Sequence, residues 1–506
     1  MNLEQKYKIL EGIARCVPEN GAGEDEENLL QNFLPLRSYG KLADPKTFLI
    51  TGGRGTGKTA LFRMLTDCEG LKYILSEGDR KRYTHLKEAR FVPGYAASGA
   101  WAKQFPISNL CTELLKKEGP EDLVCFWGGL ACASVLTACA GDKEMEALAE
   151  EYFPGELQKT LRERASEVFR WWDAMKNGKQ NWEGFLDQAD NLLNRRQKTL
   201  FLTYDELDKL CMAYDDLFAY IRGLLNFWYV RNNRFTNLKA KIFLRSDLYN
   251  ARALQFADAS KMRGYQLELK WNIQSFYRVL VKRIANSGVL EAAAYLKETP
   301  GLLQERQEEG LGYIPGDSET ALRGLVGRMI GKYMGRTPKK GSSYPWVANH
   351  IQDGNGEGAP RSFLKCFSIA ARQMLDNQED MKSLEGDKLL LPSRLQGALT
   401  EVSFDRCMEL TREEYPWIAN LMQRMRGKTM LMREEEFLLY LSPEFWNEEE
   451  RKTLPGKTSG EILDALCSLG IVMRTADNRI NFPEIYLHGF GLKRKGGIKR
   501  PKETMV

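Results

Sequence analysis

Short apolar runs alternate with longer amphipathic stretches in the first half of the chain. Runs typical of β-strands occupy residues 47–50, 90–95, 200–204 and 241–244. Between them, apolar positions recur every three or four residues, which is the period of a helix that buries one face. Strands that alternate with helices predict an α/β fold with a parallel sheet, which binds ligands at the carboxyl ends of its strands.

Two of the helical stretches are unusually long. Residues 105–196 predict a helical insertion within the α/β domain, and residues 207–230 predict one long helix after the third strand. Inside the insertion, residues 123–141 carry no charge over nineteen positions, which reaches the lower bound for a membrane span. Glycine, serine and threonine lower the hydrophobicity of this segment, so we expect a buried helix and no membrane contact.

Beyond residue 272 the pattern is helical until close to the C-terminus. There, a helix over 461–469 ends at a glycine and precedes two short strands around an Ala-Asp-Asn turn, as in a winged-helix module. Four domains are predicted. They are a helical lead-in (1–45), an α/β core with its insertion (46–272), a helical lid with a linker (273–395), and a winged-helix-like domain with a basic tail (396–506).

Charge is concentrated at one end of the chain. The formal net charge is +5, and residues 493–502 alone carry six basic groups and no acidic one. The rest of the chain is nearly neutral, so only the tail favours nucleic acid electrostatically. Ten cysteines without a C-x-x-C pair, together with only three histidines, argue against a zinc site or a disulfide scaffold. The charged N-terminus lacks an apolar signal core, which predicts a cytoplasmic protein.

The most specific motif follows the first strand and matches G-x-x-x-x-G-K-[ST]. Its residues, all expected to line a nucleotide, are Gly52, Gly53, Arg54, Gly55, Thr56, Gly57, Lys58 and Thr59, followed by Ala60. The glycines let backbone N–H groups close around phosphate oxygens. Lys58 supplies a catalytic cation to the β- and γ-phosphates, and the Thr59 hydroxyl is expected to ligate Mg²⁺.

Two carboxylates end the strand over 200–204. We expect Asp205 to hold Mg²⁺ beside the phosphates and Glu206 to polarise the attacking water as the catalytic base. The chain contains no N-K-x-D guanine motif and no LSGGQ-type signature. ATP with Mg²⁺ is therefore the expected nucleotide.

Two weaker elements complete the predicted site. Arg245 and Ser246 end the next strand, where they are expected to contact the γ-phosphate or orient the water; the alternative is that they cap a helix. Arg361 follows Gly358 and Pro360 at the start of a helix over 362–374. It is expected to reach the nucleotide from the lid, and the alternative is a solvent-facing helix start.

This set of motifs resembles the AAA+/STAND branch of P-loop ATPases, and the segments after Lys241 are similar to bacterial ATPases of the KAP group. The resemblance implies that Arg245 or Ser246 is sensor 1 and Arg361 is sensor 2. It also implies a homo-oligomer if a neighbouring subunit supplies an arginine finger, for which Arg252 and Arg263 are candidates. Lys58 and Asp205 are 147 positions apart, so a large insertion separates the two main motifs.

The sequence thus predicts an ATP-hydrolysing switch or assembly factor. The KAP resemblance implies a role in anti-phage defence, with a separate effector or sensor protein as partner. Two alternatives stay open: a DNA-binding AAA+ regulator of replication or transposition, and an ATP-gated scaffold with negligible turnover. The C-terminal domain is expected to contact either DNA, through its last helix and the basic tail, or a protein.

Overall fold

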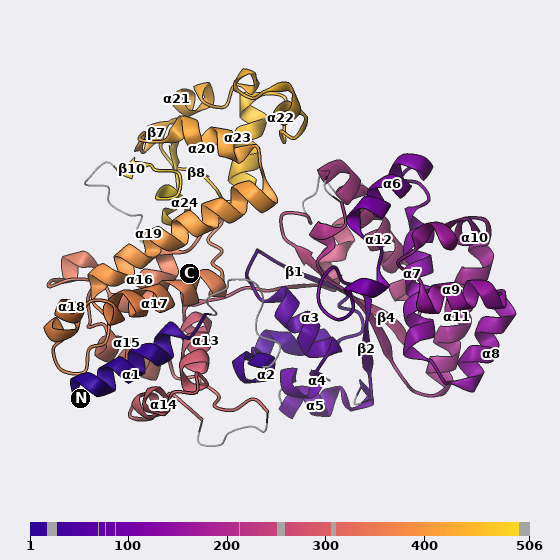
Figure 1. Ribbon diagram of the computed structural model, residues 1–506, viewed down its shortest axis with the longest axis horizontal. Helices are drawn as coiled ribbons and strands as arrows, with labels where there is room; N and C mark the ends of the chain where they lie inside the picture. The colour runs from indigo at the N-terminus through magenta and orange to yellow at the C-terminus, as the bar shows by residue number, and fades with distance from the viewer. Residues whose placement is uncertain are drawn as a thin grey trace. The chain divides into compact units, whose positions relative to one another are not determined.

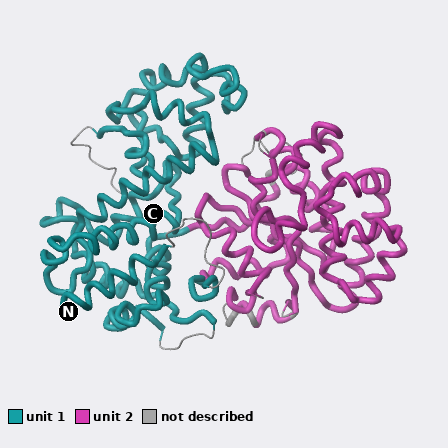
Figure 2. Tube along the Cα trace, viewed as in Figure 1, with its two compact units in different colours: residues 1–34, 271–506 teal, residues 35–270 magenta. Residues whose placement is uncertain are grey.

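The computed structural model forms two compact units, which we call the α/β unit (Pro35–Lys270) and the helical unit (Met1–Leu34 with Trp271–Val506) (Figure 2). No helix in the described part of the chain is long and apolar enough to cross a membrane. The residues that the structure describes are 1–17, 28–68, 70–75, 77–86, 88–211, 213–249, 259–304 and 310–494.

A five-stranded parallel sheet forms the centre of the α/β unit, in the order β2-β3-β4-β1-β5 (Figure 1). Its strands are β1 (Leu49–Gly52), β2 (Arg90–Tyr95), β3 (Leu200–Tyr204), β4 (Leu238–Arg245) and β5 (Gln266–Glu268). The predicted α/β class is confirmed, and four of the strands overlap the predicted runs: β2 and β3 match them, β1 lies two residues later than 47–50, and β4 extends beyond 241–244 at both ends. Strand β5 was not predicted, because only one of its three residues, Leu267, is buried.

Two lysines lie in the buried strand β4. Lys241 Nζ donates to the carbonyl oxygens of Asp44 at 2.8 Å and Thr47 at 2.6 Å, and Lys239 Nζ donates to Asn232 O at 2.8 Å. Buried charged groups are tolerated only when hydrogen-bonded, and these carbonyls supply the bonds. Burial nevertheless lowers the pKa of Lys241 to about 7. The lysines thereby connect β4 to the chain segments that flank it.

The predicted insertion is helical, and its central helix, α7, is buried. Gly128 and Gly129 of α7 lie against Trp182 and Trp171, so close that an added Cβ would meet the rings at 2.8 and 2.4 Å. The uncharged segment over 123–141 is therefore a packed core helix, as predicted. The helices are α6 (Ser108–Glu118), α7 (Leu123–Ala138), α8 (Lys143–Tyr152), α9 (Gly155–Glu163), α10 (Trp172–Asn177) and α11 (Lys179–Arg195).

The single helix predicted over 207–230 is wrong at its start. A short 3-10 helix (Leu207–Lys209) comes first, and α12 begins only at Tyr214 and ends at Arg234. Glu206, directly before the short 3-10 helix, has a left-handed φ of 55°. The other helices of this unit are α3 (Lys58–Thr66), α4 (Leu71–Ile74) and α5 (Glu77–Arg82).

The helical unit gathers the two ends of the chain. Helix α1 (Leu3–Ala14) starts with a capping box at Asn2, and it packs on α14 and α17. Gly12 permits the approach, since a Cβ there would meet Ala292 Cβ at 2.6 Å, and Ser368 Oγ donates to Ala14 O at 2.5 Å. Residues 1–34 of the predicted lead-in (1–45) thus belong to the helical unit, whereas residues 35–45 belong to the α/β unit.

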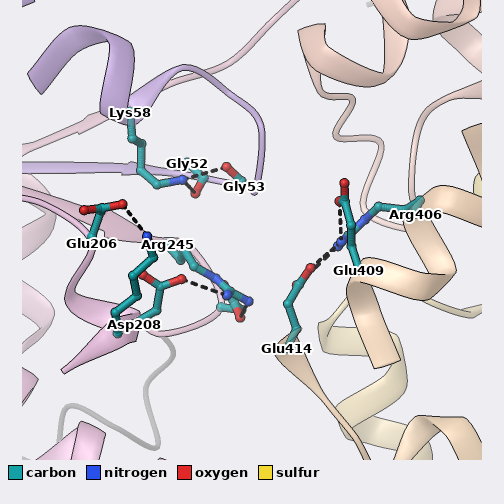
Figure 3. A network of polar contacts seen from close by, with 11 residues as sticks. Gly52, Gly53, Lys58, Glu206, Asp208, Arg245, Arg406, Glu409 and Glu414 are labelled. Carbon is teal, nitrogen blue, oxygen red and sulfur yellow. Dashed lines mark hydrogen bonds and ion pairs between the residues drawn. The ribbon is translucent and has the colours of Figure 1, made fainter. Parts of the chain in front are cut away.

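In the part of the chain that the structure describes, eight more helices of this unit come before the C-terminal elements, and most of them lie within the predicted lid, residues 273–395. They are α2 (Leu29–Asn32), α13 (Ile273–Ala285), α14 (Leu290–Lys297), α15 (Glu319–Met329), α16 (Ser343–His350), α17 (Pro360–Leu375), α18 (Gln378–Ser383) and α19 (Pro392–Glu409). Helix α19 continues in a π-helical turn (Leu410–Glu414), where the Arg406 guanidinium pairs with the Glu414 carboxylate (Figure 3).

The C-terminal elements have the order of a winged helix. In the described residues, one α-helix and two short strands precede three further α-helices and a hairpin, and the antiparallel sheet has the order β7-β9-β8. This confirms the predicted winged-helix-like domain. Its elements are α20 (Ile418–Met425), β6 (Thr429–Met430), β7 (Met432–Arg433), α21 (Glu434–Leu439), α22 (Glu448–Lys452), α23 (Ser459–Ser468), β8 (Met473–Arg474), β9 (Arg479–Asn481), α24 (Glu484–Leu487) and β10 (Lys493–Arg494).

Asp190 on α11 provides a test of how the insertion is fastened to the sheet. Its buried carboxylate accepts hydrogen bonds from the backbone N–H groups of Thr236, Asn237 and Leu238, at 2.8, 2.7 and 2.6 Å. We expect Asp190→Ala to lower the free energy of unfolding by about 3 kcal/mol, because it leaves buried donors without an acceptor. Urea unfolding followed by tryptophan fluorescence measures the change.

Asp187→Ala, one turn earlier on α11, is the matched control. Asp187 pairs with the exposed Arg234, and surface pairs contribute only about 0–1 kcal/mol. Equal losses of stability in the two variants would contradict the special role of Asp190.

Candidate nucleotide-binding site

The phosphate loop connects β1 to α3 and depends on its glycines. Gly55 and Gly57 have φ of 75° and 98°, which is the left-handed region that L-residues avoid. At Gly52 the requirement is space, because a Cβ would meet Thr56 Oγ1 at 2.5 Å. Thr56 Oγ1 also donates to Gly53 O at 2.8 Å, which closes the loop on itself. The result is a tight turn that leads into the N-terminus of a nine-residue helix.

Lys58 is folded back over this loop. Its Nζ donates to the carbonyl oxygens of Gly52 at 2.9 Å and Gly53 at 2.7 Å (Figure 3). Burial lowers the pKa of Lys58 to about 8, and the nearby carboxylate of Asp205 opposes this shift. The ammonium is thus predominantly charged at neutral pH and lies at the position where an anion above the loop would meet it.

Asp205 lies at the end of β3 with its carboxyl group buried. Its backbone N–H donates to Tyr95 O at 3.1 Å, and its side chain is hydrogen-bonded to Thr59. Burial raises the pKa of Asp205 to about 7, and the bond to Thr59 counteracts part of the shift. Among the described residues, the second carboxylate oxygen, Oδ2, has no hydrogen-bond partner.

These two side chains fit a Mg²⁺ ion. An unpaired buried carboxylate oxygen beside a threonine hydroxyl offers two hard oxygen donors, and Mg²⁺ is usually bound by one or two protein oxygens with water and phosphates. In the part of the chain that the structure describes, no group of three or more histidine, cysteine, aspartate or glutamate side chains could hold a metal. The fit is therefore to a metal that arrives with a phosphate ligand.

Glu206 is held by a side chain that the sequence did not reveal. Its Oε2 accepts hydrogen bonds from Ser98 Oγ at 2.7 Å and Ala97 N at 3.2 Å, and its Oε1 lies 2.6 Å from Lys209 Nζ. Burial tends to raise the pKa of Glu206, but the hydrogen bonds from Lys209 and Ser98 outweigh it and the pKa is lowered. Glu206 is thus ionised at neutral pH and fixed beside Asp205.

Arg245 and Ser246 end β4 next to the loop, and Ser246 N donates to Gly52 O at 3.1 Å. The Arg245 guanidinium pairs with Asp247 at 2.7 Å and with Asp208 at 3.2 Å (Figure 3). Ser246 Oγ is buried and has no hydrogen-bond partner among the described residues. Residues 246–249 form turns, so these side chains do not cap a helix there. The structure brings both predicted residues to the loop.

The remaining predicted residues lie elsewhere. Arg361 is exposed at the second position of α17 and belongs to the helical unit, so no single compact unit brings it to the loop. Arg263 is exposed in a 3-10 helix (Ala259–Tyr265), and Arg252 lies outside the described residues. Within the loop, Arg54 and Ala60 are half-buried. The site that the geometry assembles thus consists of the loop, the ends of β3 and β4, and Ser98.

Comparison with known proteins gives one family match. A family model described as ORC-CDC6-like matches residues 22–125, a segment that contains the phosphate loop and β2 but neither Asp205 nor Glu206. No curated protein matches the chain. The chain is thus similar to the ORC-CDC6-like family over this segment, whereas the assignment to the KAP group stays a prediction.

A solved structure is also matched, at a low structural score. The ORC2 protein of Aeropyrum pernix, in ADPNP–ADP complexes, is matched over 92% of this chain and 99% of its own, with 12% identity and a TM-score of 0.28. Because this score is low, the match adds nothing to what the chain's own topology shows. The α/β sheet and the winged-helix order rest on the strand pairings and the order of elements in this chain.

Proposed function

We propose that the chain binds ATP with Mg²⁺ at the loop Gly52–Thr59 and hydrolyses it. The observation that carries this proposal is the buried Asp205 carboxylate, which meets Thr59 with one oxygen and leaves the other without a partner. When bound there, Mg²⁺ would neutralise charge on the β- and γ-phosphates. Lys58 would add a second cation to the phosphates, and the loop N–H groups would bind their oxygens.

Glu206 is the residue proposed to prepare the water. Because it is ionised and held by Ser98, Ala97 and Lys209, it can accept a hydrogen bond from a water near the γ-phosphate and orient it for attack. To accept a proton from the water, a carboxylate oxygen of Glu206 must lose the hydrogen bond from one of its present donors and accept one from the water instead. Ser98 is therefore proposed as a positioning residue for the base.

For the cellular role, we propose a DNA-acting regulator of the replication-initiator type. The ORC-CDC6-like match over residues 22–125 and the winged-helix order of the C-terminal elements support this role. The defence role was implied only by the resemblance to the KAP group, and the family match favours the initiator type over it. A gel-shift or filter-binding titration decides between them, because absence of DNA affinity at low salt would eliminate the initiator role.

We further propose that the active form is a homo-oligomer in which a neighbouring subunit contributes an arginine. Arg263 is exposed in the α/β unit and is thus accessible to a neighbour. The mass of the purified protein, with and without a slowly hydrolysed ATP analogue, tests this point. A monomer under both conditions would contradict it.

Two variants separate binding from hydrolysis. Lys58→Ala should weaken ATP binding about a hundredfold or more in calorimetry, because the buried loop loses its cation. Glu206→Gln should retain ATP affinity and lose about a hundredfold or more of the hydrolysis rate, since the amide cannot accept a proton. Lys143→Ala, at an exposed lysine of α8, is the control and should change neither. Equal slow hydrolysis by wild type and Glu206→Gln would favour the ATP-gated scaffold.

The affinity for ATP with Mg²⁺ should depend on pH with a maximum between about 7 and 8. Below about pH 7, the Asp205 carboxyl group takes up a proton in the free protein, and the metal must compete with it, so affinity should fall by up to about tenfold per pH unit. Above about pH 8, Lys58 loses its proton and affinity should fall again.

Titrations with a fluorescent ATP analogue measure this profile. Asp205→Asn should lower the affinity for ATP and abolish the fall in affinity below about pH 7. Removal of Mg²⁺ by a chelator should have the same two effects. A wild-type affinity that is constant from about pH 5.5 to 7 would contradict the assignment of Asp205 as a metal ligand.

A further inference from the structure

Two segments that are distant in sequence form a small basic surface on the C-terminal domain. Strand β10 pairs in parallel with β6, with Lys493 opposite Thr429 and Arg494 opposite Met430. The backbone bonds Gly427 N to Gly491 O, at 2.9 Å, and Lys493 N to Lys428 O, at 2.8 Å, extend the pairing. The loop that leads into β6 therefore lies beside the last described residues of the chain.

Four cations gather on this pair of segments, and we call them the basic ribbon: Arg426, Lys428, Lys493 and Arg494. Three of them are exposed, and Lys428 is half-buried with its Nζ 5.1 Å from the centre of the Tyr440 ring. Among the described residues, the ribbon has a single ion pair, between Arg494 and Glu484 at 2.6 Å. The other three charges are not neutralised by a carboxylate there.

The sequence extends this charge. Directly after the ribbon, residues 495–502 add four basic residues and no acidic one. The ribbon itself, in which no described carboxylate pairs with three of the four cations, has the electrostatic character of a surface that binds nucleic-acid phosphates.

Helix α23, which leads into the hairpin of the winged helix, contains no lysine or arginine. The exposed positions of α23 are Gly460, Glu461, Asp464 and Ser468. None of these is an arginine, lysine, asparagine or glutamine, the residues that most often read base edges in a major groove. Of its two carboxylates, Asp464 pairs with Arg474 at 2.9 Å and Glu461 accepts the backbone N–H of Thr458, so this face presents no cation to the phosphates of a groove.

The C-terminal end of α23 is also occupied within the helical unit. Asn355 Nδ2 donates to Ser468 O at 3.0 Å, and Gly354 N donates to Gly470 O at 2.6 Å. The loop before α17 thus covers the end of the helix that leads to the hairpin. Both observations speak against insertion of α23 into duplex DNA.

We propose that the basic ribbon is the surface that contacts duplex DNA, through its phosphates and without reading sequence. Helix α23 stays out of the major groove. This inference rests on the proposed DNA-acting function and specifies the site through which it operates. Phosphate contacts position a protein on a duplex but carry no base information, so the affinity should depend on salt and not on sequence.

The test uses the full-length protein and a fluorescent duplex of mixed sequence, with anisotropy measured over a range of NaCl concentrations. Arg426→Glu with Lys493→Glu should lower the affinity at least about tenfold at low salt. It should also reduce the slope of log K against log salt by about 2, because two phosphate contacts are lost. Lys339→Glu with Lys340→Glu is the control with the same charge change, on an exposed 3-10 helix (Pro338–Lys340) of the same unit, and should bind like wild type.

A third variant tests the groove mode directly. Gly460 lies in the first turn of α23, and a Cβ there would meet open space, so Gly460→Glu can be made without a clash. If the ribbon is the DNA surface, this variant binds within about twofold of wild type. Loss of binding in Gly460→Glu, with normal binding by the ribbon variant, would overturn the proposal in favour of α23.

The remaining outcomes are also informative. If the double variant unfolds, as judged by circular dichroism, Arg426→Gln and Lys493→Gln are measured singly, and wild-type salt slopes for both would overturn the proposal. A wild-type protein that binds vesicles of phosphatidylserine but no DNA would show that the ribbon serves a membrane, which also overturns it. A wild type that binds DNA while the ribbon variant binds equally well refutes the ribbon but leaves the DNA-acting function intact.

Discussion

Two opposite charges, the half-buried Lys58 ammonium and the buried Asp205 carboxylate, lie near each other at the carboxyl edge of the sheet. Each is costly to remove from water, and their pKa values shift toward the neutral forms, to about 8 and about 7. The surrounding chain is arranged to hold them despite this cost. The loop carbonyls accept from Lys58, Thr59 binds one oxygen of Asp205, and the other oxygen stays open.

The strand order explains how the rest of the site follows from this constraint. Strand β4 lies between β1 and β3, so its end falls between the loop and Asp205. Arg245 at this end is neutralised by Asp208 and Asp247. Glu206 is likewise paired with Lys209, which leaves the second oxygen of Asp205, among the described residues, as an open acceptor at this edge. A divalent cation bound there would add positive charge beside the loop, which favours the anionic nucleotide.

The sequence predicted those parts of the molecule in which local pattern determines structure. Strong apolar runs located four strands, and the glycine spacing located the loop. The pattern failed where the deciding contact is distant or the element is short. Ser98 reaches Glu206 across 108 positions, and β5 has a single buried residue. The helix predicted to start at 207 starts at Tyr214, after a separate 3-10 helix, and no apolar period records this interruption.

The pairing of α1 with α17 has a consequence for how the protein is made. The α/β unit is a continuous segment, so it can fold as soon as its last strand has left the ribosome. Helix α1 is synthesised before it, but its apolar face, with Ile9, Leu10 and Ile13, is covered only by helices that are made much later. A nascent chain therefore carries an exposed amphipathic helix throughout most of its translation, which makes the N-terminus a natural binding site for a chaperone.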